Sequence, residues 1–204
     1  MAFTDNFGHP RGLLGRLMLV TMEREHLPMA KWAFGLLEVP AHGTIADIGC
    51  GGGYNVRRLL EKSASLPADK AGAKAVGIDI SEESVRKAKK VNRAEIGKRC
   101  EILQGSAENL PFSDGEIDLV TAFETVFFWK NVEACFSEIH RVLKSGGRVA
   151  VINNYGDPKI DWEKKVPCMT RRTAAEIKKL MENAGFCEIR TEEKGTLFFV
   201  EGRK

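Results

Sequence analysis

The sequence has few cysteines and no pairing pattern among them. Its five cysteines are odd in number and scattered over 204 residues, and no two of them form a C-x-x-C pair. A disulfide framework or a zinc site would show regular pairing of this kind. The cysteine usage therefore predicts a reducing, cytoplasmic setting and no bound metal.

The sequence also lacks a long apolar run. Residues 12–20 are mostly apolar, but Arg16 interrupts them and no small-residue cleavage site follows. This segment is far shorter than the roughly 20 residues that span a bilayer. We therefore expect an amphipathic N-terminal helix there, with no export signal and no membrane span.

A strong excess of one charge is missing as well. The chain has 31 basic and 28 acidic residues, which gives a formal net charge of +3. Proteins that bind nucleic acids usually carry a denser basic stripe. The densest basic stretch, residues 86–90, follows two acidic residues on an expected helix, which indicates a solvated helix face. We therefore expect no nucleic-acid partner.

Short apolar runs alternate with helix-like segments from about residue 45 onward. Near-continuous apolar runs of this length are typical of parallel strands buried on both faces. The expected strands are 44–48, 75–80, 101–104, 117–122 and 148–152. Helix starts are expected at Ser81, Asn131 and Thr173, the last with a capping box. We therefore expect five strand-helix units in a Rossmann-like, doubly wound α/β sheet.

The end of the chain follows a different pattern. Residues 186–191 and 196–202 have the character of strands, and only four residues separate them. That connection is too short for a helical crossover, so the two strands should pair as an antiparallel hairpin. The predicted sheet then has seven strands, mostly parallel. Residues 1–40 form a helical extension, and residues 41–204 form the main domain.

A glycine-rich loop after the first expected strand is the strongest local signal. It reads Asp-Ile-Gly-Cys-Gly-Gly-Gly over residues 47–53. Glycines let the backbone turn sharply and approach a ligand closely, and the free amides of the next helix point at that ligand. Such a site favours an anionic group, either phosphate or carboxylate.

Two cofactors compete for this loop. A dinucleotide site needs G-x-G-x-x-G, but Tyr54 or Val56 stands at the last position, so both registers fail. Asp47 would also repel a pyrophosphate, whereas an acid there suits a ligand with an amino group. S-adenosylmethionine carries an ammonium beside a carboxylate and has no phosphate. The loop therefore favours S-adenosylmethionine.

Asp79 ends the second expected strand, one strand-helix unit after the glycine loop. A carboxylate at that tip can accept hydrogen bonds from both hydroxyls of a ribose, as in other doubly wound nucleoside sites. The alternative is a surface acid that merely precedes a helix. We expect the ribose contact.

With these motifs in order, the chain resembles the class I S-adenosylmethionine-dependent methyltransferases. It looks closest to the small-molecule group typified by ubiquinone- and menaquinone-biosynthesis methyltransferases. The matching segments are 46–53, 77–81, 104–112, 117–120 and 141–147. The resemblance implies a cofactor site made of Asp47, Gly49, Cys50, Gly51, Asp79, Ile80, Ser106 and Ala107. Ile80 would pack on adenine, and Ser106 stands where many relatives have an aspartate for the adenine amine.

The segment after the fourth expected strand should lie beside the reacting methyl group, because ligands of such sheets bind beyond the carboxyl ends of the strands. There Phe123 is expected against the sulfonium, and Phe128 and Trp129 in an apolar acceptor pocket. Their alternative role is to pack the sheet edge. Glu124 is the candidate catalytic or substrate-binding carboxylate, unless it caps the next helix or contacts the cofactor.

Two segments are expected to close over the site as lids. One is the extension 1–40, in which His26 is a candidate base or substrate contact, with a structural hydrogen bond as its alternative. The other is the insertion near 155–172, in which Trp162 is expected to face the acceptor.

These expectations combine into one predicted reaction, direct in-line methyl transfer to a small-molecule acceptor without a metal. Positioning the nucleophile supplies much of the rate of such a transfer. Two alternatives stay open: a nicotinamide-dependent oxidoreductase, and a catalytically silent module that binds the same cofactor. A monomer or a homodimer is expected.

Overall fold

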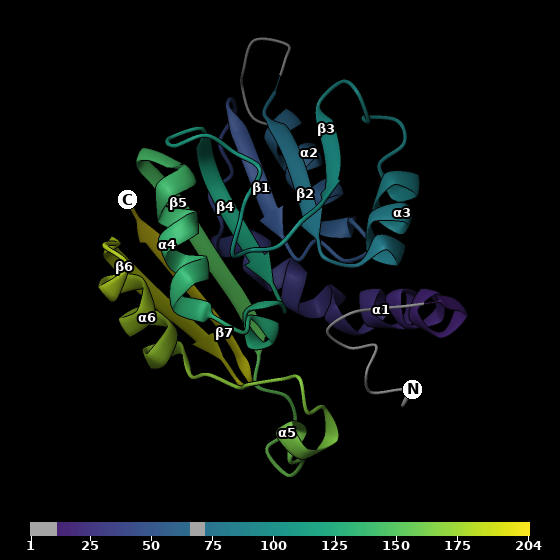
Figure 1. The fold of residues 1–204 in the computed structure, drawn as a ribbon, viewed down its shortest axis with the longest axis vertical. Coiled ribbons are helices and arrows are strands. Elements are labelled where there is room, and N and C mark those ends of the chain that lie inside the picture. Colours follow the sequence, from purple (N-terminus) through teal and green to yellow (C-terminus); the bar gives the residue numbers. More distant parts are fainter. Residues whose placement is uncertain (1–11, 66–71) are drawn as a thin grey trace.

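The computed structural model describes residues 12–65 and 72–204, and for residues 13–24 it describes the backbone only (Figure 1). The strands are β1 (Thr44–Ile48), β2 (Lys74–Asp79), β3 (Cys100–Gln104), β4 (Ile117–Phe123), β5 (Leu143–Asn154), β6 (Cys187–Lys194) and β7 (Leu197–Arg203). The α-helices are α1 (Gly12–Leu36), α2 (Tyr54–Ala64), α3 (Glu82–Val91), α4 (Val132–Val142), α5 (Trp162–Lys165) and α6 (Ala174–Asn183). A short 3₁₀ helix, η2 (Val126–Phe128), follows β4.

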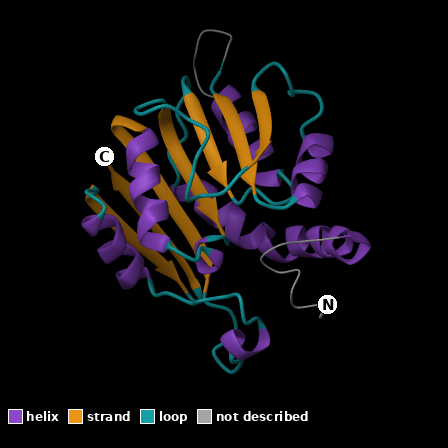
Figure 2. Cartoon of the chain, viewed as in Figure 1, coloured by secondary structure: helices purple, strands orange, loops and turns teal. Residues whose placement is uncertain are grey.

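All seven strands form one sheet in the order β3-β2-β1-β4-β5-β7-β6. The pairs from β3 to β5 are parallel, whereas β7 runs antiparallel to both β5 and β6. The predicted doubly wound sheet with an antiparallel C-terminal hairpin is therefore confirmed (Figure 2). The carboxyl ends of β1, β2 and β4 point to the same edge of the sheet (Figure 1).

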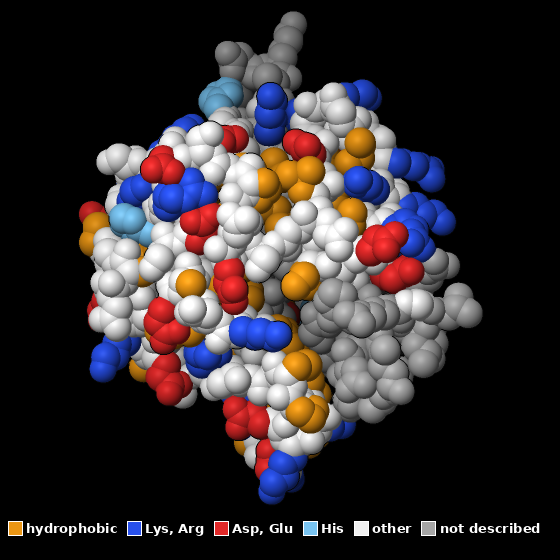
Figure 3. All heavy atoms as spheres, viewed as in Figure 1, with side chains coloured by type: hydrophobic (Ala, Val, Ile, Leu, Met, Phe, Trp, Pro, Cys, Tyr) orange, Lys and Arg blue, Asp and Glu red, His pale blue; other side chains and the backbone are white. Residues whose placement is uncertain are grey.

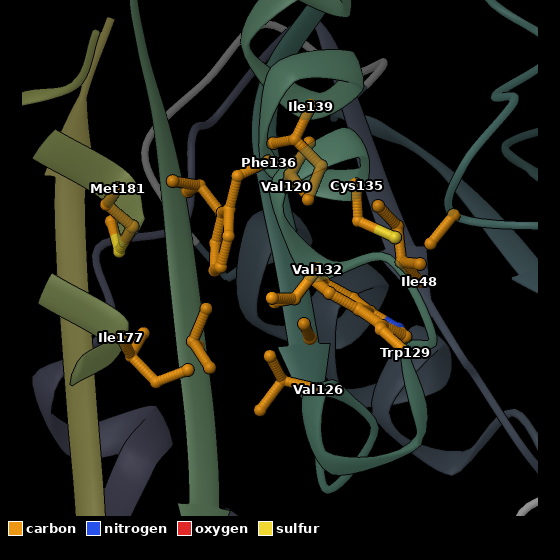
Figure 4. Packing of buried hydrophobic residues seen from close by; sticks show 14 of the residues in the cluster. Ile48, Val120, Val126, Trp129, Val132, Cys135, Phe136, Ile139, Ile177 and Met181 are labelled. Atoms are coloured by element: carbon orange, nitrogen blue, oxygen red, sulfur yellow. The ribbon is translucent and has the colours of Figure 1, made fainter. Parts of the chain in front are cut away.

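Helices cover both faces of the sheet. On one face α4 and α6 bury an apolar stripe against β4, β5 and β7. Val132, Phe136 and Ile139 of α4 point at the strands, with Ile177 and Met181 of α6 beside them (Figure 4). Each of these side chains is at most 3% exposed, and burying one contributes about 1.5–3 kcal/mol.

The opposite face is covered by α1, α2 and α3. The second half of α1 packs Met29, Ala33 and Leu37 against the central strands, and α2 and α3 pack on β2 and β3. Its first half continues along the carboxyl edge of the sheet and contacts α3 (Figure 1). The extension expected over residues 1–40 is thus helical from Gly12 to Leu36, and residues 1–11 lie outside the described residues.

The predicted helix starts are confirmed by their caps. The Ser81 hydroxyl accepts from the Ser84 amide at 3.3 Å, and the Asn131 side chain accepts from the Ala134 amide at 3.0 Å. Thr173 forms the expected reciprocal capping box with Glu176. Each cap satisfies an amide that the helix itself leaves unpaired.

The expectation of five strand-helix units is wrong at one place. Residues 105–116, which connect β3 to β4 and are all described, form no helix. Pro111 lacks an amide and disfavours helical geometry in the residue before it. Side chains from α4 support the connection instead: Glu138 accepts from the Leu110 amide at 2.8 Å, and Arg141 donates to the Phe112 carbonyl at 3.0 Å.

In the described part of the chain, no helix is both long and apolar enough to cross a membrane. No cluster of three or more potential metal ligands occurs among the same residues. The five cysteines, all of which are described, are free thiols.

Candidate active site

The glycine loop adopts backbone angles that glycine reaches without strain. Gly49, Gly51 and Gly53 have φ values of 70°, 52° and 77°. The amides of Gly49 and Cys50 donate to the Ile78 carbonyl at 2.7 and 3.0 Å, which ties the loop to the end of β2. A Cβ added to Gly51 would meet no described atom within 4 Å, so the loop faces open space there.

Asp79 holds the loop and the start of α3 together. Its Oδ2 accepts from the Gly51 amide and its Oδ1 from the Ser81 amide, both at 2.8 Å. A carboxylate has about four lone-pair positions, so it can accept from several donors at once. Asp79 is therefore both part of the loop's frame and a candidate ligand contact.

A cavity of about 280 Å³, here called the loop cavity, opens between the glycine loop and the segment after β4. Five of the predicted cofactor residues line it: Gly49, Asp79, Ile80, Ser106 and Ala107. The Ile80 side chain is 51% exposed, an unusual exposure for a large apolar residue, and it is available to pack on a ring. The Ser106 hydroxyl accepts from the Glu108 amide at 3.2 Å.

Asp47 lies beneath the loop and does not line the loop cavity. It is 2% exposed, and its Oδ1 accepts from the Thr121 hydroxyl at 2.7 Å. Burial raises the pKa of Asp47 to about 7; the Thr121 hydrogen bond opposes this rise, and the charge of Asp79 adds to it. Asp47 therefore links β1 to β4 through Thr121, and its contact with the methionyl end stays a prediction.

Three other predicted cofactor residues also do not line the loop cavity. Gly51 contributes its amide to Asp79. Cys50 is 7% exposed, and burial raises its thiol pKa. Phe123 is buried in the core and stacks on Phe34 of α1, with ring centroids 5.6 Å apart.

A second cavity of about 210 Å³, here called the Glu124 cavity, adjoins the first. Phe128 lines both, so it stands where they meet. Phe127, Tyr155 and Trp162 supply further aromatic wall, and Trp162 also donates its indole N–H to the Asp157 carbonyl at 3.2 Å. Trp129, expected in the acceptor pocket, instead lines the loop cavity beside Phe136.

Glu124 has an unusual conformation and environment. Its φ is 56°, a region that non-glycine residues seldom occupy and that often marks functional sites. Its amide donates to the Ile152 carbonyl at 2.8 Å. Burial raises the pKa of Glu124 to about 8, against an opposing hydrogen bond from the Asn154 amide. Within the described residues its Oε1 has no hydrogen-bond partner.

His26 of α1 lines the same cavity and lies close to Glu124. Its Nε2 is 3.8 Å from Glu124 Oε2, which is too long for a hydrogen bond. Burial lowers the pKa of His26, although the nearby Glu25 charge opposes this. Burial thus favours the uncharged form of each group, whereas a cation placed beside Glu124 would favour its carboxylate.

Sequence reasoning missed Asn153, which lines the Glu124 cavity. It is 1% exposed, and in the described part of the chain neither its Nδ2 nor its Oδ1 has a hydrogen-bond partner. The signal available in the sequence was a polar residue directly after the apolar run 149–152, at the carboxyl end of a central strand.

On the face that Figure 3 shows, lysine and arginine side chains are interspersed with acidic ones, and apolar side chains gather between them. This mixture agrees with the balanced charge of the sequence.

The sheet order, the glycine loop and the acid that ends β2 together define a nucleoside-binding α/β protein of the class I methyltransferase type. Residues 46–151 match the family model described as "Methyltransferase domain". The chain therefore belongs to this family, the class I S-adenosylmethionine-dependent methyltransferases, and the family's methyl donor is S-adenosylmethionine.

Curated relatives agree with this family. The chain is 33% identical over 113 residues to 24-methylenesterol C-methyltransferase 2 of Oryza sativa. The aligned residues cover 55% of this chain and 29% of that protein. It is 36% identical over 109 residues to demethylmenaquinone methyltransferase of Lactococcus lactis, covering 53% of this chain and 41% of that protein. The match thus spans less than half the length of either relative.

Solved structures share the fold at low identity. A chain from the complex between the Haloferax volcanii Trm112 methyltransferase activator and a methyltransferase superposes with a TM-score of 0.78. It is 22% identical, and the match covers 91% of this chain and 93% of that chain. This likeness supports the architecture and nothing finer.

Proposed function

We propose that this protein transfers a methyl group from S-adenosylmethionine directly to a small-molecule acceptor. The observation that carries the proposal is the pair of adjoining cavities that meet at Phe128. The loop cavity has the glycine loop and Asp79 on its wall, and the Glu124 cavity is mainly aromatic. Such an arrangement suits a donor in the first cavity and an acceptor in the second.

The residues of the loop cavity fit this donor. Gly49 lines this cavity, and Gly51, two residues further along the loop, has open space over it where the methionyl end would approach the backbone. Asp79 would accept from the ribose, Ile80 would pack on adenine, and Ser106 and Ala107 would lie at the adenine edge. When bound, S-adenosylmethionine supplies an electrophilic methyl group on a positively charged sulfur.

The chain's own contribution is to orient the acceptor and exclude water. Glu25 and His26 of α1 line the Glu124 cavity together with residues of the segment 155–169, so we propose that these two segments act as lids. Excluding water strengthens the electrostatic interactions that remain in the site. Glu124 and His26 are the proposed groups that hold or move a proton at the acceptor.

Family membership sets aside the nicotinamide-dependent alternative, and one experiment separates the remaining two. The full chain would be incubated with methyl-labelled S-adenosylmethionine and a broad panel of small acceptors, while calorimetry measures binding of S-adenosylhomocysteine. Binding together with labelled product is the expected result. Tight binding with no transfer to any acceptor would identify a catalytically silent module and overturn the proposal.

A further inference from the structure

The Glu124 cavity is acidic and aromatic. Glu25 and Glu124 line it, and no lysine or arginine does so among the side chains that the structure describes. Its one described histidine, His26, has a pKa lowered by burial and so carries little positive charge near neutral pH. An anionic acceptor, such as a carboxylate or a phosphate ester, would find no described countercharge there.

Two of the side chains that line this cavity carry buried hydrogen-bonding groups. Glu124 Oε1 and both polar atoms of Asn153 have no partner among the described residues. Buried polar groups are nearly always paired, so groups left unpaired at a cavity wall indicate that a ligand completes them. Two of these three atoms are oxygens that accept hydrogen bonds, and a ligand with several N–H donors would suit them.

The remaining wall favours a cation as well. Phe128 and Tyr155 line the cavity, and the faces of aromatic rings attract ammonium groups, as Lys165 Nζ shows by lying 5.0 Å from the ring centre of Trp162. The rings also offer an apolar surface for the rest of a small molecule. The two glutamates, the unpaired acceptor oxygens and the aromatic rings thus all favour an ammonium group.

We propose that the acceptor is a small primary or secondary amine, held as its ammonium form by the Glu124 carboxylate and by Asn153 Oδ1. This inference rests on the proposed methyltransferase function and names the substrate class of that same site. It also assigns Asn153 as a specificity-determining residue.

The chemistry balances with Glu124 as the base. The bound ammonium gives one proton to the Glu124 carboxylate and becomes a neutral amine. The nitrogen lone pair then forms the new N–C bond while the C–S bond of the donor breaks, and the electrons of that bond stay on sulfur. The product leaves as a methylated ammonium, and Glu124 returns its proton to water. The raised pKa of Glu124 is closer to the pKa of an amine than the pKa of an ordinary glutamate is. This smaller difference eases the proton transfer.

Matched acceptors test the proposal. Each skeleton is offered as an amine, an alcohol and a carboxylate: phenethylamine, phenethyl alcohol and phenylacetate, then hexylamine, hexanol and hexanoate. Calorimetry is done on the full chain saturated with S-adenosylhomocysteine, and transfer is measured with labelled donor. We expect amines to bind at least about tenfold more tightly than their alcohols, carboxylates to be weakest, and label to enter the amines.

Variants assign this preference to the two side chains. Glu124→Gln and Asn153→Leu should each lose most of the preference for amine over alcohol, while their affinity for S-adenosylhomocysteine stays unchanged and shows that they fold. Glu101→Gln, on the exposed side of β3, is the matched control and should behave as the wild type.

Three outcomes would overturn the amine proposal while S-adenosylhomocysteine still binds. They are an alcohol or carboxylate that matches its amine, no amine preferred on any skeleton, and variants that keep the full preference. If S-adenosylhomocysteine itself fails to bind the wild type, the proposed function has failed instead, so the two failures are distinguishable.

Discussion

Asn153 should reduce the stability of the fold while it serves the acceptor. It is 1% exposed with two unpaired polar atoms among the described residues, and leaving a buried donor or acceptor unpaired costs about 1–3 kcal/mol. Leucine has a similar size and no polar atom. We therefore expect Asn153→Leu to raise the free energy of unfolding by about 2 kcal/mol, which raises the Tm of a domain of this size by roughly 4–8 °C.

The neighbouring asparagine supplies the matched control for this prediction. Asn154 Oδ1 accepts from the Gly156 amide at 2.9 Å, so Asn154→Leu removes a bond that exists. We expect that variant to be less stable than the wild type by about 1 kcal/mol. Urea unfolding and thermal melts of all three proteins provide the measurement. If Asn153→Leu is no more stable than the wild type, Asn153 is paired in solution and the reasoning is refuted.

Three further predictions follow from particular contacts. Asp79→Ala should weaken S-adenosylhomocysteine binding by about 2–4 kcal/mol in calorimetry, and an unchanged dissociation constant would remove Asp79 from the donor site. Because the folded pKa of Glu124 is raised from 4.5 to about 8, its protonated form stabilises the fold below its unfolded pKa, and this stability is lost as pH rises through about 8. The urea midpoint of the wild type should therefore fall more than that of Glu124→Gln between about pH 5 and about pH 9, and parallel profiles would contradict the burial of this carboxyl. Thr173→Ala should lower the unfolding free energy by about 1 kcal/mol through loss of the capping box, and no change in urea would show that the cap contributes nothing.

Much of the fold could be predicted because its signals are local. Each expected strand is an apolar run, and Ser81, Asn131 and Thr173 carry caps whose side chains reach amides only three residues away. The missing helix between β3 and β4 shows the limit of this reasoning. That connection is fixed by Glu138 and Arg141, which lie about 30 positions further along the chain.

The candidate site could be predicted only in part, for a related reason. Which wall a side chain lines depends on how distant elements pack, and a motif does not record that. Phe123 and Phe128 lie on one short aromatic segment, yet Phe123 turns under α1 while Phe128 stands between the two cavities. Asp47 belongs to the loop motif but is buried within β1, and Asn153 belongs to no motif.

The most direct test of the central claim is a calorimetric titration of the full chain with S-adenosylhomocysteine, compared with NADH. The account predicts that S-adenosylhomocysteine binds at one site per chain, that NADH does not compete for it, and that Asp79→Ala weakens it. Binding of NADH at the same site, or no heat with S-adenosylhomocysteine, would contradict the account.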